Sequence, residues 1–204
     1  MRAVESLPQA FYEFERIGGV LEFAVFEDAD GDVKSAFAAM ASIVKDIDQA
    51  KLLLLGSRPI DDKTFYGEWY RASDDALMFA GTCRLKDGQE LVNPTYRELD
   101  AIEVRGSASL SPEEGSGGQF AYAFSQPPYG LNARPGKIQD LFYEIRGFVL
   151  PPCFTHEISD WSSSRLPEAS DYFSEGMEYW GVFLFTVYIP ELRRLTAIAG
   201  STTD

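Results

Sequence analysis

The chain has 204 residues, of which 45% are apolar and 14% aromatic, enough to build the core of one domain. Thirty-two acidic residues against 18 basic ones give a formal net charge of −14. Such a surface repels nucleic acids and anionic membranes, because both are polyanions, and it attracts a basic protein. The composition therefore argues against nucleic-acid and membrane partners and favours a compact acidic protein.

Two cysteines, Cys83 and Cys153, are too few for a disulfide framework. The first residues include acids and show no apolar leader segment, and no uncharged apolar run is long enough to span a membrane. We therefore expect a cytoplasmic protein with reduced thiols.

The N-terminal quarter of the chain predicts a strand–helix unit. Residues 6–19 predict a short helix that Ser6 caps, and residues 20–26 predict a strand from their β-branched and aromatic content. Apolar residues then recur every three or four positions, which predicts a helix over residues 32–50. Residues 51–55, the run KLLLL, fit the last turn of that helix or a short buried strand, and we prefer the strand.

From residue 65 to residue 124 the pattern favours strands. Four runs of aromatic and β-branched residues are separated by short polar segments. Asp87-Gly88 predicts a hairpin turn, because both residue types tolerate a positive φ. The glycine- and serine-rich segment 111–118 predicts a loop. Together these runs indicate an antiparallel meander.

The C-terminal third predicts further short elements. Residues 137–147 predict a helix, and Pro167 is expected to open another that ends at Phe173. Residues 180–201 predict a β-hairpin with its turn at residues 190–193. Both faces of its first strand are apolar, so we expect that strand near the centre of its sheet.

No internal repeat, low-complexity tract or shift of composition divides the chain. We therefore predict a single α+β domain over residues 1–204. Its expected parts are an antiparallel β-meander core, the N-terminal strand–helix unit and the C-terminal β-hairpin.

The most concentrated chemical signal is the stretch FEDADGDVKSAF, which places four acids within six residues. These acids are Glu27, Asp28, Asp30 and Asp32. The last three match the first ligands of a calcium-binding EF-hand loop, but Val33 and Ala39 stand where that loop needs a glycine and a bidentate glutamate. A phosphate loop is disfavoured too, because four acids repel the anion. We therefore predict no metal site here.

Asp32, or Asp30, directly precedes the predicted helix and can cap it by accepting hydrogen bonds from the free amides of the first turn. One acid is enough for the cap. Solubility explains the other acids, or else they form a contact surface for a basic partner. The segment from Glu22 to Asp32 holds five acids and no base, which suits such a surface.

A second acidic segment runs from residue 157 to residue 178, with six acids and one base, Arg165. Trp161 stands there among polar residues. An exposed tryptophan flanked by Glu157 and Asp160 has the composition of an interface hot spot. A tryptophan that covers the edge of the core is the alternative. We predict Glu157, Asp160 and Trp161 as partner-binding residues.

No motif in the chain predicts a catalytic residue or a cofactor. A single histidine, His156, excludes a zinc site that uses two histidines. Cys153 lies three residues before it, whereas a catalytic Cys–His pair normally meets across the fold. Nucleophile-elbow, Walker and dinucleotide-binding patterns are absent from the sequence.

These observations favour an acidic binding protein of the inhibitor or immunity type, which would neutralise a basic toxin or enzyme by protein–protein binding. The first alternative is a hydrolase or transferase with a carboxylate-lined pocket. The second is a homo-oligomeric assembly subunit, for example a homodimer through the apolar edge of its sheet.

Overall fold

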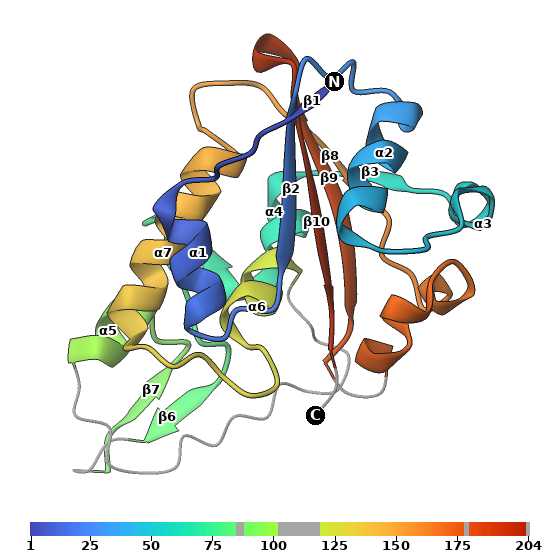
Figure 1. The fold of residues 1–204 in the computed structure, drawn as a ribbon. Helices are drawn as coiled ribbons and strands as arrows, with labels where there is room; N and C mark the ends of the chain where they lie inside the picture. Colours follow the sequence, from blue (N-terminus) through green and yellow to red (C-terminus); the bar gives the residue numbers. More distant parts are fainter. Residues whose placement is uncertain (85–87, 102–118, 178–179, 203–204) are drawn as a thin grey trace.

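The computed structural model describes residues 1–84, 88–101, 119–177 and 180–202. A six-stranded antiparallel sheet lies at its centre, in the order β1-β2-β10-β9-β8-β3 (Figure 1). Its strands are β1 (Arg2–Ala3), β2 (Glu22–Glu27), β3 (Arg58–Ile60), β8 (Glu157–Asp160), β9 (Val182–Ile189) and β10 (Arg194–Ser201). Two small hairpins pair β4 (Tyr70–Arg71) with β5 (Ala76–Leu77) and β6 (Thr82–Arg84) with β7 (Glu90–Val92). Helices and antiparallel strands in one chain confirm the α+β class.

The predicted C-terminal hairpin is confirmed. Strands β9 and β10 pair over all eight residues of each. A 3-10 turn at Pro190–Leu192 joins them, closed by Arg193 in the left-handed conformation (φ 46°). Strand β9 lies between β10 and β8, and its neighbours Leu184 and Phe185 are both fully buried, one in each core cluster. A strand that is apolar on both faces is therefore central, as expected.

Helices cover both faces of this sheet (Figure 1). One face carries α1 (Gln9–Arg16), α4 (Asp62–Tyr66), α6 (Phe120–Ser125) and α7 (Pro135–Val149), with α5 (Tyr96–Ala101) packed on α7. A 3-10 turn at Gly67–Trp69 follows α4. The other face carries α2 (Val33–Ile43), α3 (Gln49–Leu55) and 3-10 turns at Leu166–Glu168, Asp171–Phe173 and Glu175–Met177. The chain consequently builds two hydrophobic cores, one on each side of the sheet.

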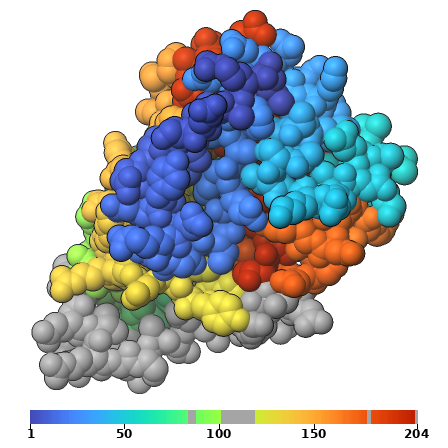
Figure 2. All heavy atoms as spheres, viewed as in Figure 1, coloured from blue at the N-terminus to red at the C-terminus, as the bar shows by residue number. Residues whose placement is uncertain are grey.

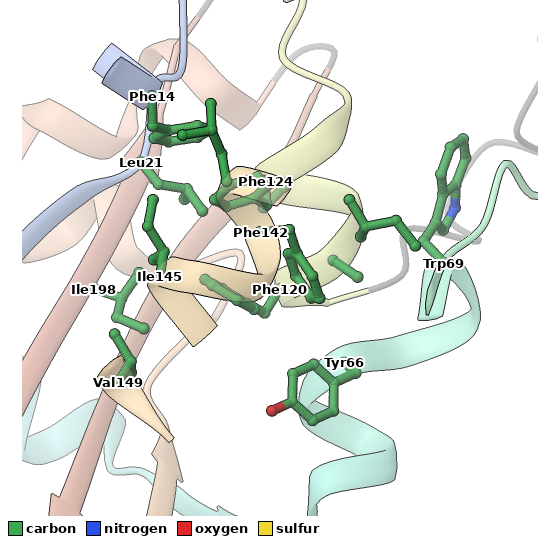
Figure 3. Close-up of a cluster of buried hydrophobic side chains, with 14 of the residues drawn as sticks. Phe14, Leu21, Tyr66, Trp69, Phe120, Phe124, Phe142, Ile145, Val149 and Ile198 are labelled. Atoms are coloured by element: carbon green, nitrogen blue, oxygen red, sulfur yellow. The ribbon is translucent and has the colours of Figure 1, made fainter. Parts of the chain in front are cut away.

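The larger core is rich in aromatic rings (Figure 3). Phe14 of α1 stacks on Phe124 of α6 with 4.1 Å between ring centroids, and Phe65 of α4 stacks on Phe120 of α6 at 4.8 Å. Phe142 of α7 packs edge-on against Phe124. Aromatic pairs add about 0.5–1.5 kcal/mol each beyond the area they bury. These rings therefore hold together four helices that are distant in sequence.

In the described residues the predicted β-meander between residues 65 and 124 is confirmed only in part. Helices α4 and α6 occupy residues where strands were expected. The six residues of α6 are buried except for Tyr122, and periodicity cannot distinguish a short helix that is buried all round from a strand. Within the described residues the meander is reduced to the pairs β4–β5 and β6–β7. Asp87 of the predicted turn, residues 102–110 of the third predicted strand and the predicted loop 111–118 lie outside the described residues.

The predicted helix over residues 32–50 is two helices. Helix α2 ends at Ile43, where Val44 adopts an extended conformation (φ −100°, ψ 104°). Asp46 then takes a positive φ of 56°, which an aspartate tolerates better than most residues. The chain turns at this point before α3 begins.

The preferred strand at residues 51–55 is also wrong, because this run belongs to α3. Asp48 caps that helix: its carboxylate accepts from the amides of Ala50 (3.0 Å) and Lys51 (3.1 Å). Gly56, with a φ of 76°, ends it. The run therefore forms the helical turn that was the less favoured alternative.

Two further predictions need adjustment. The N-terminal helix is confirmed, but α1 begins at Gln9, so Ser6 lies outside the cap position. Pro167 lies inside a 3-10 turn, and the segment that ends at Phe173 consists of such turns instead of one α-helix.

Candidate functional site

The capping role predicted for Asp32 is confirmed. Its carboxylate accepts a hydrogen bond of 2.7 Å from the amide of Ser35 in the first turn of α2. The hydrogen bonds from Ser35 lower the pKa of this carboxyl group, because they stabilise the charged form. The capping of α2 therefore accounts for an acid at position 32 without a partner.

Two other acids of the same stretch pair with arginines. Glu27 accepts from Arg2 at 2.6 Å, and Asp30 accepts from Arg193, the turn residue of the C-terminal hairpin, at 2.7 Å. Asp28 is exposed and has a positive φ of 54°. The attraction of this turn for a basic partner is consequently weaker than the sequence suggests, because two of its charges already have counter-charges.

The expectation that Trp161 is an exposed hot spot is wrong. Its side chain is 4% exposed and belongs to the second core, where its ring packs against Phe37 and its Nε1 donates to Thr186 at 3.0 Å. Asp160 is buried as well: it accepts from Nε (3.0 Å) and Nη2 (2.7 Å) of Arg58. Strand β8 brings both residues into the interior, and neither side chain presents a surface to a partner.

Glu157, at the start of β8, is exposed. The fold brings it close to the acidic turn, because Glu157 and Asp32 line one small hollow of about 80 Å³ together with Gly31 and Tyr188. A hollow of this size holds water and no larger ligand. The two acidic segments predicted as separate surfaces therefore meet at one place on the molecule.

A much larger hollow, of about 850 Å³, lies between the end of α2, the start of α3 and the 3-10 turns that follow β8. Figure 2 shows this region, where the cyan chain of α3 borders the orange chain of the 3-10 turns. Its carboxylates are Glu22, Asp46, Asp48, Glu168 and Asp171, and its cations are Lys45 and Lys51. We call it the acidic hollow. It is open, and its lining is mostly polar.

Part of the charge in the acidic hollow is internally paired. Glu168 accepts from Arg165 at 2.7 Å, which lowers the pKa of its carboxyl group, and Asp48 lies 3.8 Å from Lys51. Glu22 accepts from the hydroxyl of Tyr172 at 3.0 Å, a contact that leaves its negative charge uncompensated. The hollow therefore keeps a negative balance.

Two exposed leucines of α3 follow Lys51 of the acidic hollow in the sequence. Leu53 is 59% exposed and Leu54 is 87% exposed, although both stand in a helix whose Leu52 is fully buried. Leu54 follows Lys51 of the hollow by three positions, so the two side chains share one side of the helix. We define the α3 surface as the acidic hollow together with Leu53 and Leu54.

The structure gives His156 a partner other than Cys153. Nε2 of His156 lies 2.6 Å from Oδ1 of Asp62 in α4. Both cysteines are free; Cys153 is exposed, and burial raises the pKa of the Cys83 thiol. A buried thiol of raised pKa is a poor nucleophile.

Sequence reasoning missed the acidic hollow. Asp46 and Asp48 were placed inside a continuous helix, although an aspartate directly before the run QAKLL is an N-cap signal that would have separated α2 from α3. Glu168 and Asp171 fall inside the predicted acidic segment, but their side chains were not singled out. The sequence could have predicted the cap at Asp48, but it could not have predicted that the acids of the hollow lie close together.

The described residues contain no group of three or more metal-ligating side chains placed to hold an ion. Among the helices of the described segments, none combines the length and the apolar character that a bilayer crossing needs.

In comparisons with known proteins, the chain matches no protein-family model, no curated protein and no solved structure.

Proposed function

We propose that this protein is an acidic binding protein of the inhibitor or immunity type, whose partner is a basic protein such as a toxin or an enzyme. The observation that carries the proposal is the α3 surface, where a carboxylate-lined hollow adjoins two exposed leucines. The proposal includes a cytoplasmic location, which suits two free thiols.

Charge supports this choice of partner. The chain has a formal net charge of −14, so it attracts a basic protein over a distance of about one Debye length, 8 Å at physiological salt. Within contact range, the hollow offers carboxylates to lysine or arginine side chains. Such complementarity raises the association rate and rejects acidic competitors.

The exposed leucines add an apolar contribution to binding. Leu54 is 87% exposed, and its burial by a partner would stabilise the complex. The helix already orders the backbone of Leu54, so little backbone entropy is lost on binding. Interfaces typically combine such an apolar centre with a charged rim. The α3 surface has this composition.

The alternatives receive less support. In the described residues, every carboxyl group with a shifted pKa has that pKa lowered by hydrogen bonds or ion pairs, whereas a carboxylic general acid needs a raised one. The homo-oligomer alternative, by strand addition, needs a long free edge. The edge strands of the central sheet are short: β1 has two residues, and β3 has three that include Pro59. Such short edges disfavour strand addition.

The test begins with affinity capture from the native host on the immobilised protein. The captured protein is then produced alone, and its association and dissociation rates are measured at low and high salt. Asp46→Asn with Asp171→Asn removes two charges from the acidic hollow. Glu68→Gln with Glu144→Gln removes two exposed charges elsewhere and serves as the matched control.

We expect a basic captured protein that loses its own activity when bound. The hollow variant should associate several-fold more slowly than the control and depend less on salt. Leu54→Ala should raise the dissociation rate by about tenfold or more, while Val92→Ala, at a residue of β7 that is 71% exposed, should not. Equal rates for the hollow and control variants, or a partner that keeps its activity, would refute the proposal.

A further inference from the structure

A second cavity, of about 410 Å³, opens between α4, β4 and the C-terminal end of α7. It lies on the opposite face of the sheet from the α3 surface, because its walls belong to the larger core and those of the acidic hollow to the smaller one. Its volume falls within the range of small-molecule sites in proteins, about 300–1,000 Å³. The proposed protein contact does not use this cavity.

One part of its wall is a rigid polar network around Asp75. The hydroxyl of Tyr70 donates to Oδ1 of Asp75 at 2.6 Å, and Nη2 of Arg146 donates to Oδ2 of the same carboxylate. The Arg146 side chain is 12% exposed, so this guanidinium is nearly immobilised. Asp75 therefore fixes both a phenol and a cation at the cavity.

Another part of the wall is the pair His156 and Asp62. A carboxylate only accepts hydrogen bonds, so Nε2 of His156 donates to Oδ1 of Asp62 over 2.6 Å. This contact orients the imidazole ring. It leaves Nδ1 as the nitrogen available to another group.

Two nitrogens of these side chains are buried without a partner. Within the described part of the chain, neither Nε of Arg146 nor Nδ1 of His156 has a hydrogen-bond partner. Buried polar atoms in native proteins are almost always hydrogen-bonded, and an exception calls for an explanation. Nε of Arg146 is a hydrogen-bond donor on a side chain that lines the cavity, so it indicates a ligand with an acceptor oxygen.

The remaining wall suits a flat apolar body. The rings of Tyr66 and Tyr70 lie 4.3 Å apart between centroids, and Leu150 and Pro152 line the same cavity. Figure 3 shows Tyr66 at the margin of the aromatic core, with its hydroxyl pointing away from the phenylalanine rings. Burial raises the pKa of this phenol to about 12, so it is a neutral hydrogen-bond donor at physiological pH.

The charges at the cavity suit a single negative charge. Arg146 is paired with Asp75, so the charge of its guanidinium is largely compensated, and the carboxylate of Asp62 accepts from the imidazole of His156. Lys63 is exposed at the cavity and adds one positive charge. One carboxylate pairs with this ammonium, whereas a phosphate monoester brings more negative charge than one lysine compensates.

We propose that this cavity binds a small aromatic monocarboxylic acid. The carboxylate accepts from Nε of Arg146 and from the hydroxyl of Tyr66, and it lies within reach of the Lys63 ammonium. The aromatic body packs against the rings of Tyr66 and Tyr70. The protein would then carry a small-molecule site in addition to its protein contact.

The experiment is titration calorimetry of the whole protein with four probes that share one ring system: naphthoate, naphthamide, naphthyl phosphate and naphthylmethylamine. We expect naphthoate to bind about tenfold or more tightly than its neutral amide, since the amide lacks the charge-assisted hydrogen bonds. The amine should not bind. Failure of naphthoate to bind, or binding no tighter than that of the amide or the phosphate, would overturn the proposal.

Variants locate the site. Lys63→Gln and Tyr66→Phe should each weaken naphthoate binding several-fold while leaving naphthamide binding less affected. The matched controls are Lys34→Gln, at an exposed lysine of α2, and Tyr96→Phe, at another buried phenol. Both should bind naphthoate as the wild type does. Lys63 is exposed and Tyr66→Phe keeps the ring, so both variants should fold. Equal affinities in the test and control variants would place the ligand elsewhere and refute the proposal.

Discussion

Asp160 and Arg58 form an ion pair whose two partners differ in exposure, so removing one or the other should have different consequences. The Asp160 side chain is fully buried, whereas that of Arg58 is 64% exposed. Asp160 also accepts from the amide of Ser162 at 2.9 Å. Arg58→Ala leaves a buried carboxylate without its counter-charge. Asp160→Ala leaves an arginine that turns toward water and one amide without its acceptor.

The magnitudes follow from this asymmetry. Breaking a buried ion pair costs about 3–5 kcal/mol when the remaining charge stays buried, and the exposure of Arg58 suggests the lower limit of that range for Arg58→Ala. Asp160→Ala should cost about 1–2 kcal/mol, chiefly for the lost hydrogen bonds. The double variant leaves no buried charge, so its cost should be close to that of Asp160→Ala alone.

Urea unfolding followed by circular dichroism measures the free energy of unfolding of all three variants. Arg97→Ala is the matched control, because Arg97 pairs with Asp140 at a site where both side chains are about half exposed, and it should cost under about 1 kcal/mol. An Asp160→Ala loss as large as that of Arg58→Ala, or a double-variant loss equal to the sum of the single losses, would refute the reasoning.

Three further predictions concern stability. Asp32→Ala should lower the melting temperature by removing the cap of α2, while Asp28→Ala should leave it nearly unchanged; equal losses in thermal denaturation would contradict the capping role. Trp161→Ala should destabilise the fold by about 3–5 kcal/mol in urea, because it empties a buried site, and an unchanged unfolding midpoint would be inconsistent with its burial. Burial raises the pKa of Tyr96 from 10 to about 12, so its stabilising contribution is complete below pH 10 and is lost as the pH rises through 12. That loss should amount to about 2–3 kcal/mol and be absent in Tyr96→Phe; identical alkaline unfolding of the variant and the wild type would count against it.

The sequence predicted local structure correctly where contacts between residues close in the chain decide it. The cap at Asp32 depends on an amide three positions away, and the hairpin at Pro190–Leu192 joins strands that follow each other directly. Trp161 could not be placed in this way. Its polar neighbour Asp160 is buried because Arg58, 102 positions away in sequence, neutralises it, and no pattern around Trp161 encodes that contact.

The sequence by itself determined the charge, the α+β class, the central position of β9 and the cap of α2, because these depend on composition or on contacts within one turn. Only the tertiary structure decided which side chains converge. Glu22 and Asp171 share the acidic hollow, and Asp62 and His156 share the second cavity, although each pair is distant in sequence. Strand pairing in the sheet brings these segments together, and that pairing is set by the packing of whole elements, which no local pattern specifies.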